Sequence, residues 1–167
     1  MTKKHITEDD ARSDNFKNIV RLEVSSKDDF RTSTVRSLYE WWSEYYPSVP
    51  RREDFDVSNH WSIAPSLYMI EVVGPGEYRH RLNGETVVDI VGVSLRGHEI
   101  SASCPLPELR RLAAYFDILV EGRKSFRCNG IAEAFGTKYS EFETVDCPLL
   151  DQNGNVGFIL GAISLIE

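Results

Sequence analysis

The chain has 167 residues, of which 41% are hydrophobic and 11% aromatic, so it can form one domain with a substantial apolar core. Its formal net charge of −7 argues against a nucleic-acid partner, because phosphate binding requires a clustered basic surface. The three cysteines, Cys104, Cys128 and Cys147, are odd in number and lack C-x-x-C spacing, which favours reduced thiols in the cytosol.

The first segment, MTKKHITEDDARSDN, is polar and has no apolar core typical of a secretion signal. No apolar run approaches the ~18 residues that span a bilayer, so we expect a cytoplasmic protein without a membrane segment. Residues 1–25 are expected to form an N-terminal arm, flexible or partly docked, in which FKNIVRLEV could be a short strand. Residues 26–167 are expected to form one domain.

A helix is predicted over residues 27–46. Ser26 stands three residues before Asp29, a pairing typical of a helix N-terminus. Large apolar groups then recur at helical spacing until Pro47. They are Phe30, Val35, Leu38, Trp41, Trp42 and Tyr45. A helix with so broad an aromatic face must pack against its own domain or against a second copy.

Two strands and two helices are predicted next. SLYMIEVVG reads as a strand buried on both faces, and Gly74-Pro75-Gly76 turns the chain into a returning strand over 77–82, placed near a sheet edge. ETVVDIVG reads as a short helix that Gly92 ends, and PLPELRRLAAYFDILVEG as a longer helix with Gly122 as its C-cap.

The last third predicts three strands. Residues 125–134 and 138–147 form a pair joined through Phe135-Gly136-Thr137, and a turn over Asp151–Gly154 leads into the apolar segment VGFILGAISLI. Two hairpins separated by helices predict an antiparallel sheet with helices on one face, which is an α+β domain.

Four segments together resemble a PAS domain, and more narrowly a bacterial family of stand-alone PAS-like proteins. They are LYEWWSEYYPSVPRREDFD, IAPSLYMIEVV, YRHRLNGETVVDIVGVSLRG and FETVDCPLLDQNGNVGFILGAI, and they cover about residues 31–166. The resemblance lies in their order and spacing, and the first 30 residues have no counterpart in it.

This resemblance implies a five-stranded antiparallel sheet with short helices on one face and an additional N-terminal helix. It also implies a non-catalytic sensory or regulatory role in signal transduction, with a small-molecule ligand, a signalling protein partner and a homodimer. Ligand-binding candidates are expected on the inner sheet face and the helices over it: Tyr68, Ile70, Tyr78, His80, Val88, Leu95, Phe116, Phe126, Phe142 and Phe158. Candidates for a dimer interface are Leu38, Trp41, Trp42 and Tyr45.

Cofactor and phosphate motifs are not found. The glycines at 84, 92 and 97 match neither phosphate-binding loop pattern and read as turn formers. No histidine stands at metal-ligand spacing, and His80 on a strand and His98 in a turn do not fit the helical histidine of haem-binding PAS domains. The surroundings of Cys104 and Cys128 do not resemble the flavin-binding motif. We therefore expect no metal site and neither haem nor flavin, and the sequence leaves the identity of any other cofactor open.

Two alternatives remain open. A small α+β enzyme of the isomerase or hydratase type could use one buried carboxylate as a base, although no catalytic motif is found. A buried carboxylate with a raised pKa would be the sign of such an enzyme. A ligand-free adaptor that only binds proteins is the other alternative.

Overall fold

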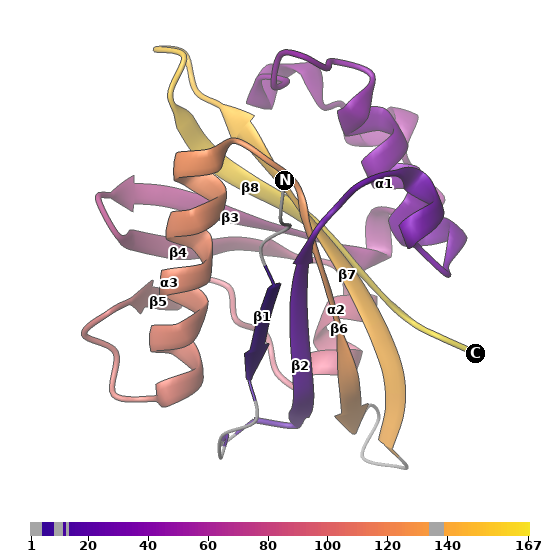
Figure 1. Cartoon of the computed structure of the whole chain (residues 1–167), viewed down its shortest axis with the longest axis vertical. Helices are drawn as coiled ribbons and strands as arrows, with labels where there is room; N and C mark the ends of the chain where they lie inside the picture. The colour runs from indigo at the N-terminus through magenta and orange to yellow at the C-terminus, as the bar shows by residue number, and fades with distance from the viewer. Residues whose placement is uncertain (1–4, 9–11, 13, 134–138) are drawn as a thin grey trace.

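The computed structural model describes residues 5–8, 12, 14–133 and 139–167. Within them, one antiparallel sheet of eight strands has the order β1-β2-β6-β7-β8-β3-β4-β5 (Figure 1). The strands are β1 His5–Glu8, β2 Phe16–Glu23, β3 Leu67–Gly74, β4 Glu77–Asn83, β5 Glu99–Ser101, β6 Phe126–Glu133, β7 Tyr139–Leu150 and β8 Val156–Leu165. The α-helices are α1 Ser33–Ser43, α2 Glu85–Val91 and α3 Pro107–Gly122.

The sheet is larger than the five strands that the sequence predicted. The predicted strands are β3, β4, β6, β7 and β8, and they are neighbours in the sheet, with β8 near its centre. The N-terminal arm adds β1 and β2 beside β6, and β5 adds beyond β4, so the returning strand β4 lies next to the edge strand, near the edge as predicted. The arm can join because the free N–H and C=O groups of β6 accept a strand, and because Ile19 of β2 is buried against the core.

The helices lie on both faces of the sheet (Figure 1). Successive side chains of a strand point to opposite faces, so Leu67 and Met69 of β3 pack in the cluster below α1, whereas Ile70 packs below α3. Helix α2 covers the α3 side as well, where Val87 and Ile90 pack against β6, β7 and β8. Helices α2 and α3 therefore share one face, which we call the inner face, and α1 covers the other, the outer face.

Helix α1 is shorter than the predicted range 27–46. The capping box of Ser26 and Asp29 is formed, but it closes a single 3-10 turn over Lys27–Asp29. Phe30 then adopts extended backbone and buries its ring in the core. Helix α1 begins after Thr32, whose hydroxyl accepts a hydrogen bond from the Val35 amide at 3.4 Å.

The ends of the other helices follow two different rules. Gly92 ends α2 with φ of 90°, as its sequence position predicts, because a left-handed residue suits glycine. Helix α3 includes Gly122 and is capped instead by Arg123 at φ 51°, so the predicted cap was one residue early.

The predicted turn through 135–137 lies outside the described residues. No helix in the described part of the chain is long and apolar enough to cross a membrane.

Candidate functional site

The inner face of the sheet has a buried polar centre at Asp146 of β7. The hydroxyl of Tyr68 donates a hydrogen bond to Asp146 Oδ1 at 2.5 Å, and the hydroxyl of Tyr115 donates to Oδ2 at 2.6 Å. Asp146 is 4% exposed, so both carboxylate oxygens depend on these partners rather than on water. The centre thus joins β3, β7 and α3 through one side chain.

A glycine makes this geometry sterically possible. Gly161 of β8 lies opposite Tyr68 on one side and opposite Asp146 on the other. The ring of Tyr68 crosses the bare backbone of Gly161 to reach the carboxylate, and an added Cβ there would lie 2.4 Å from the tyrosine hydroxyl. Only glycine leaves this path open.

The N-terminal arm places a positive charge beside this centre. Arg21 of β2 lies opposite Cys128 of β6, is 5% exposed, and holds its guanidinium carbon 4.6 Å from the centroid of the Tyr115 ring. Such a distance is typical of a cation–π interaction. Arg21 therefore belongs to the same buried cluster as Asp146, Tyr68 and Tyr115, which we call the Asp146 centre.

The electrostatics of the Asp146 centre follow from its burial. Burial raises the pKa of Asp146, whereas the hydrogen bonds from Tyr115 and Tyr68 and the charge of Arg21 oppose that rise. Burial, followed by the neighbouring Asp146, raises the pKa of both tyrosines well above the ordinary value. Both phenols therefore stay protonated and can donate. Burial also raises the pKa of the nearby Cys128 thiol to about 11.

Most of the predicted ligand-binding residues meet on the inner face. Tyr68, Ile70, Tyr78, Phe116 and Phe126 pack with α3 in one cluster. The rings of Tyr78 and Phe116 lie 5.2 Å apart at their centroids. Phe142 packs in the adjoining cluster below α2. These side chains fill the space between sheet and helices with their own contacts.

The other four predicted residues lie outside these two clusters, although His80 is on the same side of β4 as Tyr78. Phe158 points to the outer face and packs with the α1 cluster, and its neighbour Ile159 is the residue that faces α3. Val88 and Leu95 are half-buried. His80 is buried with its Nδ1 atom unpartnered, and burial, followed by the nearby His98, lowers its pKa to about 4.

Sequence reasoning missed three members of the Asp146 centre. The signal for Asp146 was a lone charged residue inside the otherwise buried strand TVDCPLL. Tyr115 lay unremarked within the apolar pattern of α3, where its hydroxyl required a partner. Arg21 stood in a segment whose strand character the sequence left open, so nothing tied it to the core.

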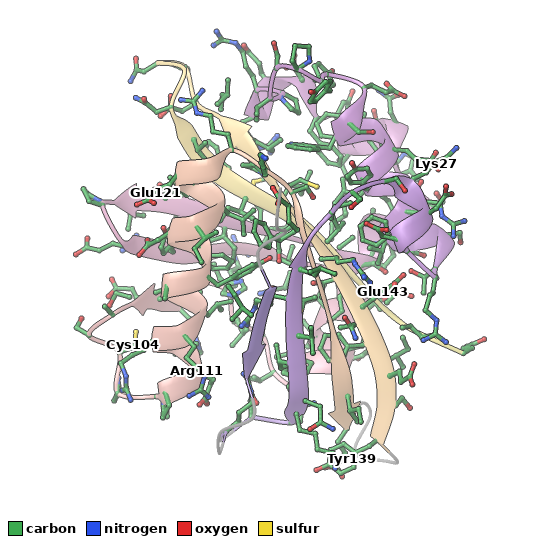
Figure 2. All side chains as sticks on the ribbon, in the orientation of Figure 1. Lys27, Cys104, Arg111, Glu121, Tyr139 and Glu143 are labelled. Atoms are coloured by element: carbon green, nitrogen blue, oxygen red, sulfur yellow. The ribbon has the colours of Figure 1, made fainter. Side chains whose placement is uncertain are left out.

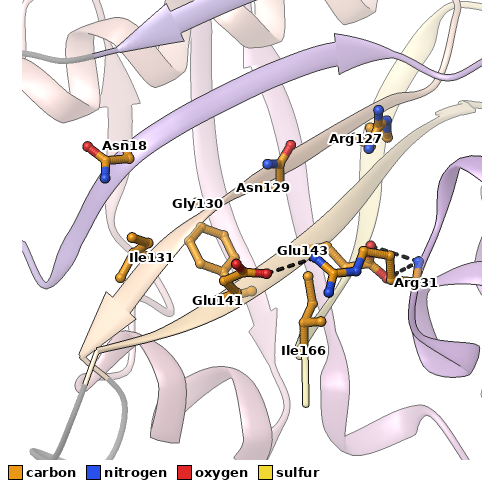
Figure 3. Close-up of a pocket in the computed structure, with 10 residues that line it drawn as sticks. Asn18, Arg31, Arg127, Asn129, Gly130, Ile131, Glu141, Glu143 and Ile166 are labelled. Atoms are coloured by element: carbon orange, nitrogen blue, oxygen red, sulfur yellow. Dashed lines mark hydrogen bonds and ion pairs between the residues drawn. The ribbon is translucent and has the colours of Figure 1, made fainter.

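A shallow hollow of about 260 Å³ lies on the outer face over β6 and β7 (Figure 3). Arg31 and Glu141 form an ion pair at 2.8 Å on its rim. Glu143 points from β7 toward the chain that enters α1 and accepts hydrogen bonds from the amides of Arg31 and Thr32 (Figures 2 and 3). The hollow is therefore lined by charges that largely satisfy one another.

A wider hollow of about 600 Å³ opens beside the β3–β4 turn and the C-terminal part of α3. Tyr78 lines it and donates a hydrogen bond to Asp117 Oδ1 at 2.5 Å. Glu121 and Asp151 add two more acidic side chains. In the described part of the chain, no three His, Cys, Asp or Glu side chains gather closely enough to hold a metal ion.

The proposed dimer residues mostly contact their own domain. Leu38 is fully buried on the face of α1 that packs against the sheet, and Trp42 Nε1 donates to the Pro148 carbonyl at 2.8 Å. Trp41 packs edge-on against two rings, with centroids 5.0 Å from Phe55 and 5.5 Å from Tyr45. Intramolecular packing thus accounts for much of this aromatic face, and a homodimer through it stays a prediction.

Comparison with known protein families identifies the family of this chain. The sequence profile of the PAS domain family matches residues 30–164, which is most of the chain. The chain belongs to the PAS domain family. No curated protein matches it. The arm with β1 and β2, including Arg21, lies before the matched residues.

One solved structure is similar at the level of the fold. It is described as an RNA-binding Light-Oxygen-Voltage receptor, with a TM-score of 0.50 and 8% identity over 94% of this PAS chain. The chain spans 40% of that protein's length. Another is a sensory box histidine kinase/response regulator from Burkholderia thailandensis E264, with a TM-score of 0.37, 17% identity, and coverage of 70% of this chain and 85% of that one.

Proposed function

We propose that this PAS domain is a non-catalytic sensory or regulatory module that binds a small molecule, a protein partner or both in signal transduction. The observation that carries the proposal is the Asp146 centre, because one buried carboxylate ties together the central strand β7, strand β3, helix α3 and, through Arg21, the N-terminal arm. A module that senses a ligand needs such a link between its interior and its surface.

The physical argument rests on the cost of burying polar groups. Each oxygen of Asp146 has one strong donor, and removing either donor leaves a buried acceptor that costs about 1–3 kcal/mol. A ligand or partner that changes one of these bonds therefore shifts the balance between two arrangements of α3 and the arm. The signal leaves by non-covalent contact with a partner or a second copy.

Exposed aromatic side chains offer a surface for such a contact. Tyr46 and Trp61, which follow α1, are 84% and 70% exposed. Exposed aromatic residues of this size are enriched in protein interfaces. This surface, rather than the buried part of α1, is our candidate for the contact with a second copy or another protein in the cytoplasm. We propose no nucleic-acid partner, given the net charge of −7.

A second function is favoured by one observation. Asp146 is a buried carboxylate with a raised pKa and two phenol donors, which are the parts that an isomerase or hydratase of the small α+β type would use. Both oxygens of Asp146, however, already accept hydrogen bonds from Tyr68 and Tyr115, and a carboxylate held in this way is poorly placed to take a proton from a substrate. The sensory function is therefore better supported than the enzyme. Catalytic turnover in the wild-type chain that is lost in Asp146→Asn would make the enzyme the better-supported function.

A thermal-shift screen of the purified chain against a metabolite panel, with native mass spectrometry of the fresh protein, tests the sensory function. We expect at least one compound to raise the unfolding midpoint progressively as its concentration rises above its dissociation constant. Tyr115→Phe keeps the ring but removes the donor to Asp146, and it should weaken that response. A panel without any response, together with no bound mass, would leave the ligand-free adaptor as the better description.

A further inference from the structure

The space that the Arg21 guanidinium occupies has the chemistry of a cation-binding site. Its floor is the face of the Tyr115 ring, and the carboxylate of Asp146 lies nearby as the opposing charge. We propose that this is the ligand site of the module, that Arg21 is its built-in occupant, and that its ligand is a small molecule with a guanidinium or ammonium group. This inference rests on the sensory function proposed above and names the ligand class.

The aromatic floor is well suited to a cation. Tyr115 donates its hydroxyl hydrogen to Asp146 Oδ2, and this bond to an anion pushes electron density into the ring. A more electron-rich ring face attracts a cation more strongly. Tyr68 holds the other carboxylate oxygen, so Asp146 is fixed in place before any ligand arrives. Because Asp146 is already fixed, binding a cation loses less side-chain conformational entropy than it would at a flexible carboxylate.

The element that carries Arg21 is suited to being displaced. Strand β2 pairs with β6 through a register shift between Lys17 and Val20, and Asn18 there has φ of 55°, a left-handed conformation that interrupts the strand and that asparagine adopts more readily than most residues. The family match begins at residue 30, so the arm is additional to the matched domain. A ligand cation that replaces Arg21 would release β2 and expose the edge of β6 as the output of the module.

Chemical rescue tests the site directly. In the full chain, Arg21→Ala removes the built-in cation and leaves a hole of guanidinium shape, which methylguanidinium can fill. We expect millimolar methylguanidinium to raise the thermal midpoint of Arg21→Ala in a saturable way. Methylurea, which has a similar shape without the charge, should have no comparable effect. Arg31→Ala is the matched control, because Arg31 forms an exposed ion pair elsewhere.

The double variant Arg21→Ala/Asp146→Asn sharpens the result. Without the carboxylate, methylguanidinium should bind about tenfold more weakly or not at all. An equal effect of methylguanidinium on Arg21→Ala and Arg31→Ala would overturn the cation site. If Arg21→Ala is unfolded, recovery of its near-UV circular dichroism with methylguanidinium, and not with methylurea, supports the site, and no recovery overturns it.

The experiments distinguish failure of the cation site from failure of the sensory function. A wild-type chain that responds to a neutral or anionic metabolite, while Arg21→Ala ignores methylguanidinium, would keep the sensor and discard the cation site. A chain that responds to nothing in the panel would discard the sensor itself.

Discussion

The ring of Tyr68 lies directly on Gly161, so that a Cβ added to this glycine would be 2.0 Å from Tyr68 Cζ. Gly161→Ala must therefore push the ring away and break its hydrogen bond to Asp146. We expect a loss of at least about 2 kcal/mol in the free energy of unfolding, from overpacking together with an unsatisfied carboxylate oxygen. Urea denaturation followed by tryptophan fluorescence measures it.

Gly122→Ala is the matched control for this prediction. Gly122 belongs to α3, and a Cβ added there meets no atom within 4 Å. Replacing a helical glycine with alanine should raise stability by about 0.5–1 kcal/mol. Equal destabilisation by both substitutions would mean that steric contact with Tyr68 is not the cause.

The sequence predicted the five central strands because each has a clear local signature. The turn Gly74-Pro75-Gly76 and the apolar segment of β8 both indicate their structure without help from distant residues. The strands β1 and β5 were not predicted, because short edge strands depend on a neighbour to pair with and carry little signal of their own. The start of α1 was also placed too early. The carboxylate that accepts hydrogen bonds from the Arg31 and Thr32 amides belongs to Glu143, more than a hundred residues away in the chain, so local sequence gives no sign of it.

The candidate site was predicted less completely than the fold. A shift of one position along β8 reverses the face of a side chain, which is why Phe158 was expected on the inner face and Ile159 was overlooked. The Asp146 centre combines residues from β2, β3, β7 and α3, and no local pattern links them. Buried polar residues in apolar segments, such as Asp146, are the signal that remains visible in a sequence.

The carboxylate of Glu143 fastens the start of α1 to the sheet, and its removal should loosen that helix. It accepts hydrogen bonds from the amides of Arg31 and Thr32 and, at 2.6 Å, from the Thr32 hydroxyl. Glu143→Ala leaves these donors without their anion, so we expect a loss of about 2–3 kcal/mol in the free energy of unfolding. Hydrogen exchange should show lower protection at the N-terminal end of α1.

Glu141→Ala is the control for Glu143. Glu141 forms an ion pair with Arg31 in which both side chains are mostly exposed, so solvent screens the attraction. Its loss should cost less than about 1 kcal/mol. If both substitutions cost the same, the outer-face charges would act as a general network rather than as a cap on α1.

The three cysteines should differ sharply in reactivity. Burial raises the pKa of Cys147 and raises that of Cys128 to about 11, so both remain thiols, whereas Cys104 is partly exposed. Because the thiolate is the reactive form, we expect a disulfide reagent to modify one thiol quickly in the folded chain and three in denaturant. Cys104→Ser should remove the fast phase. A fast phase that survives this substitution would place the reactive thiol elsewhere.

His80 should make the fold sensitive to mild acid. Burial lowers its pKa from the ordinary value of 6.5 to about 4, so the unfolded chain binds a proton at higher pH than the folded chain does. Its contribution to stability is therefore complete above pH 6.5, falls as the pH drops from 6.5 toward 4, and changes no further below that. This difference in pKa corresponds to about 3 kcal/mol.

Comparing wild type with His80→Gln isolates this contribution. Other groups titrate in the same range, and Asp146 acts in the opposite direction because its pKa is raised, so its contribution to stability grows as the pH falls. Subtracting the two stability curves removes these shared effects. We expect wild type to lose stability relative to His80→Gln as the pH is lowered from 7 to 4.5, as measured by urea midpoints at each pH. Parallel curves would show that His80 is protonated in the folded chain as readily as in the unfolded one.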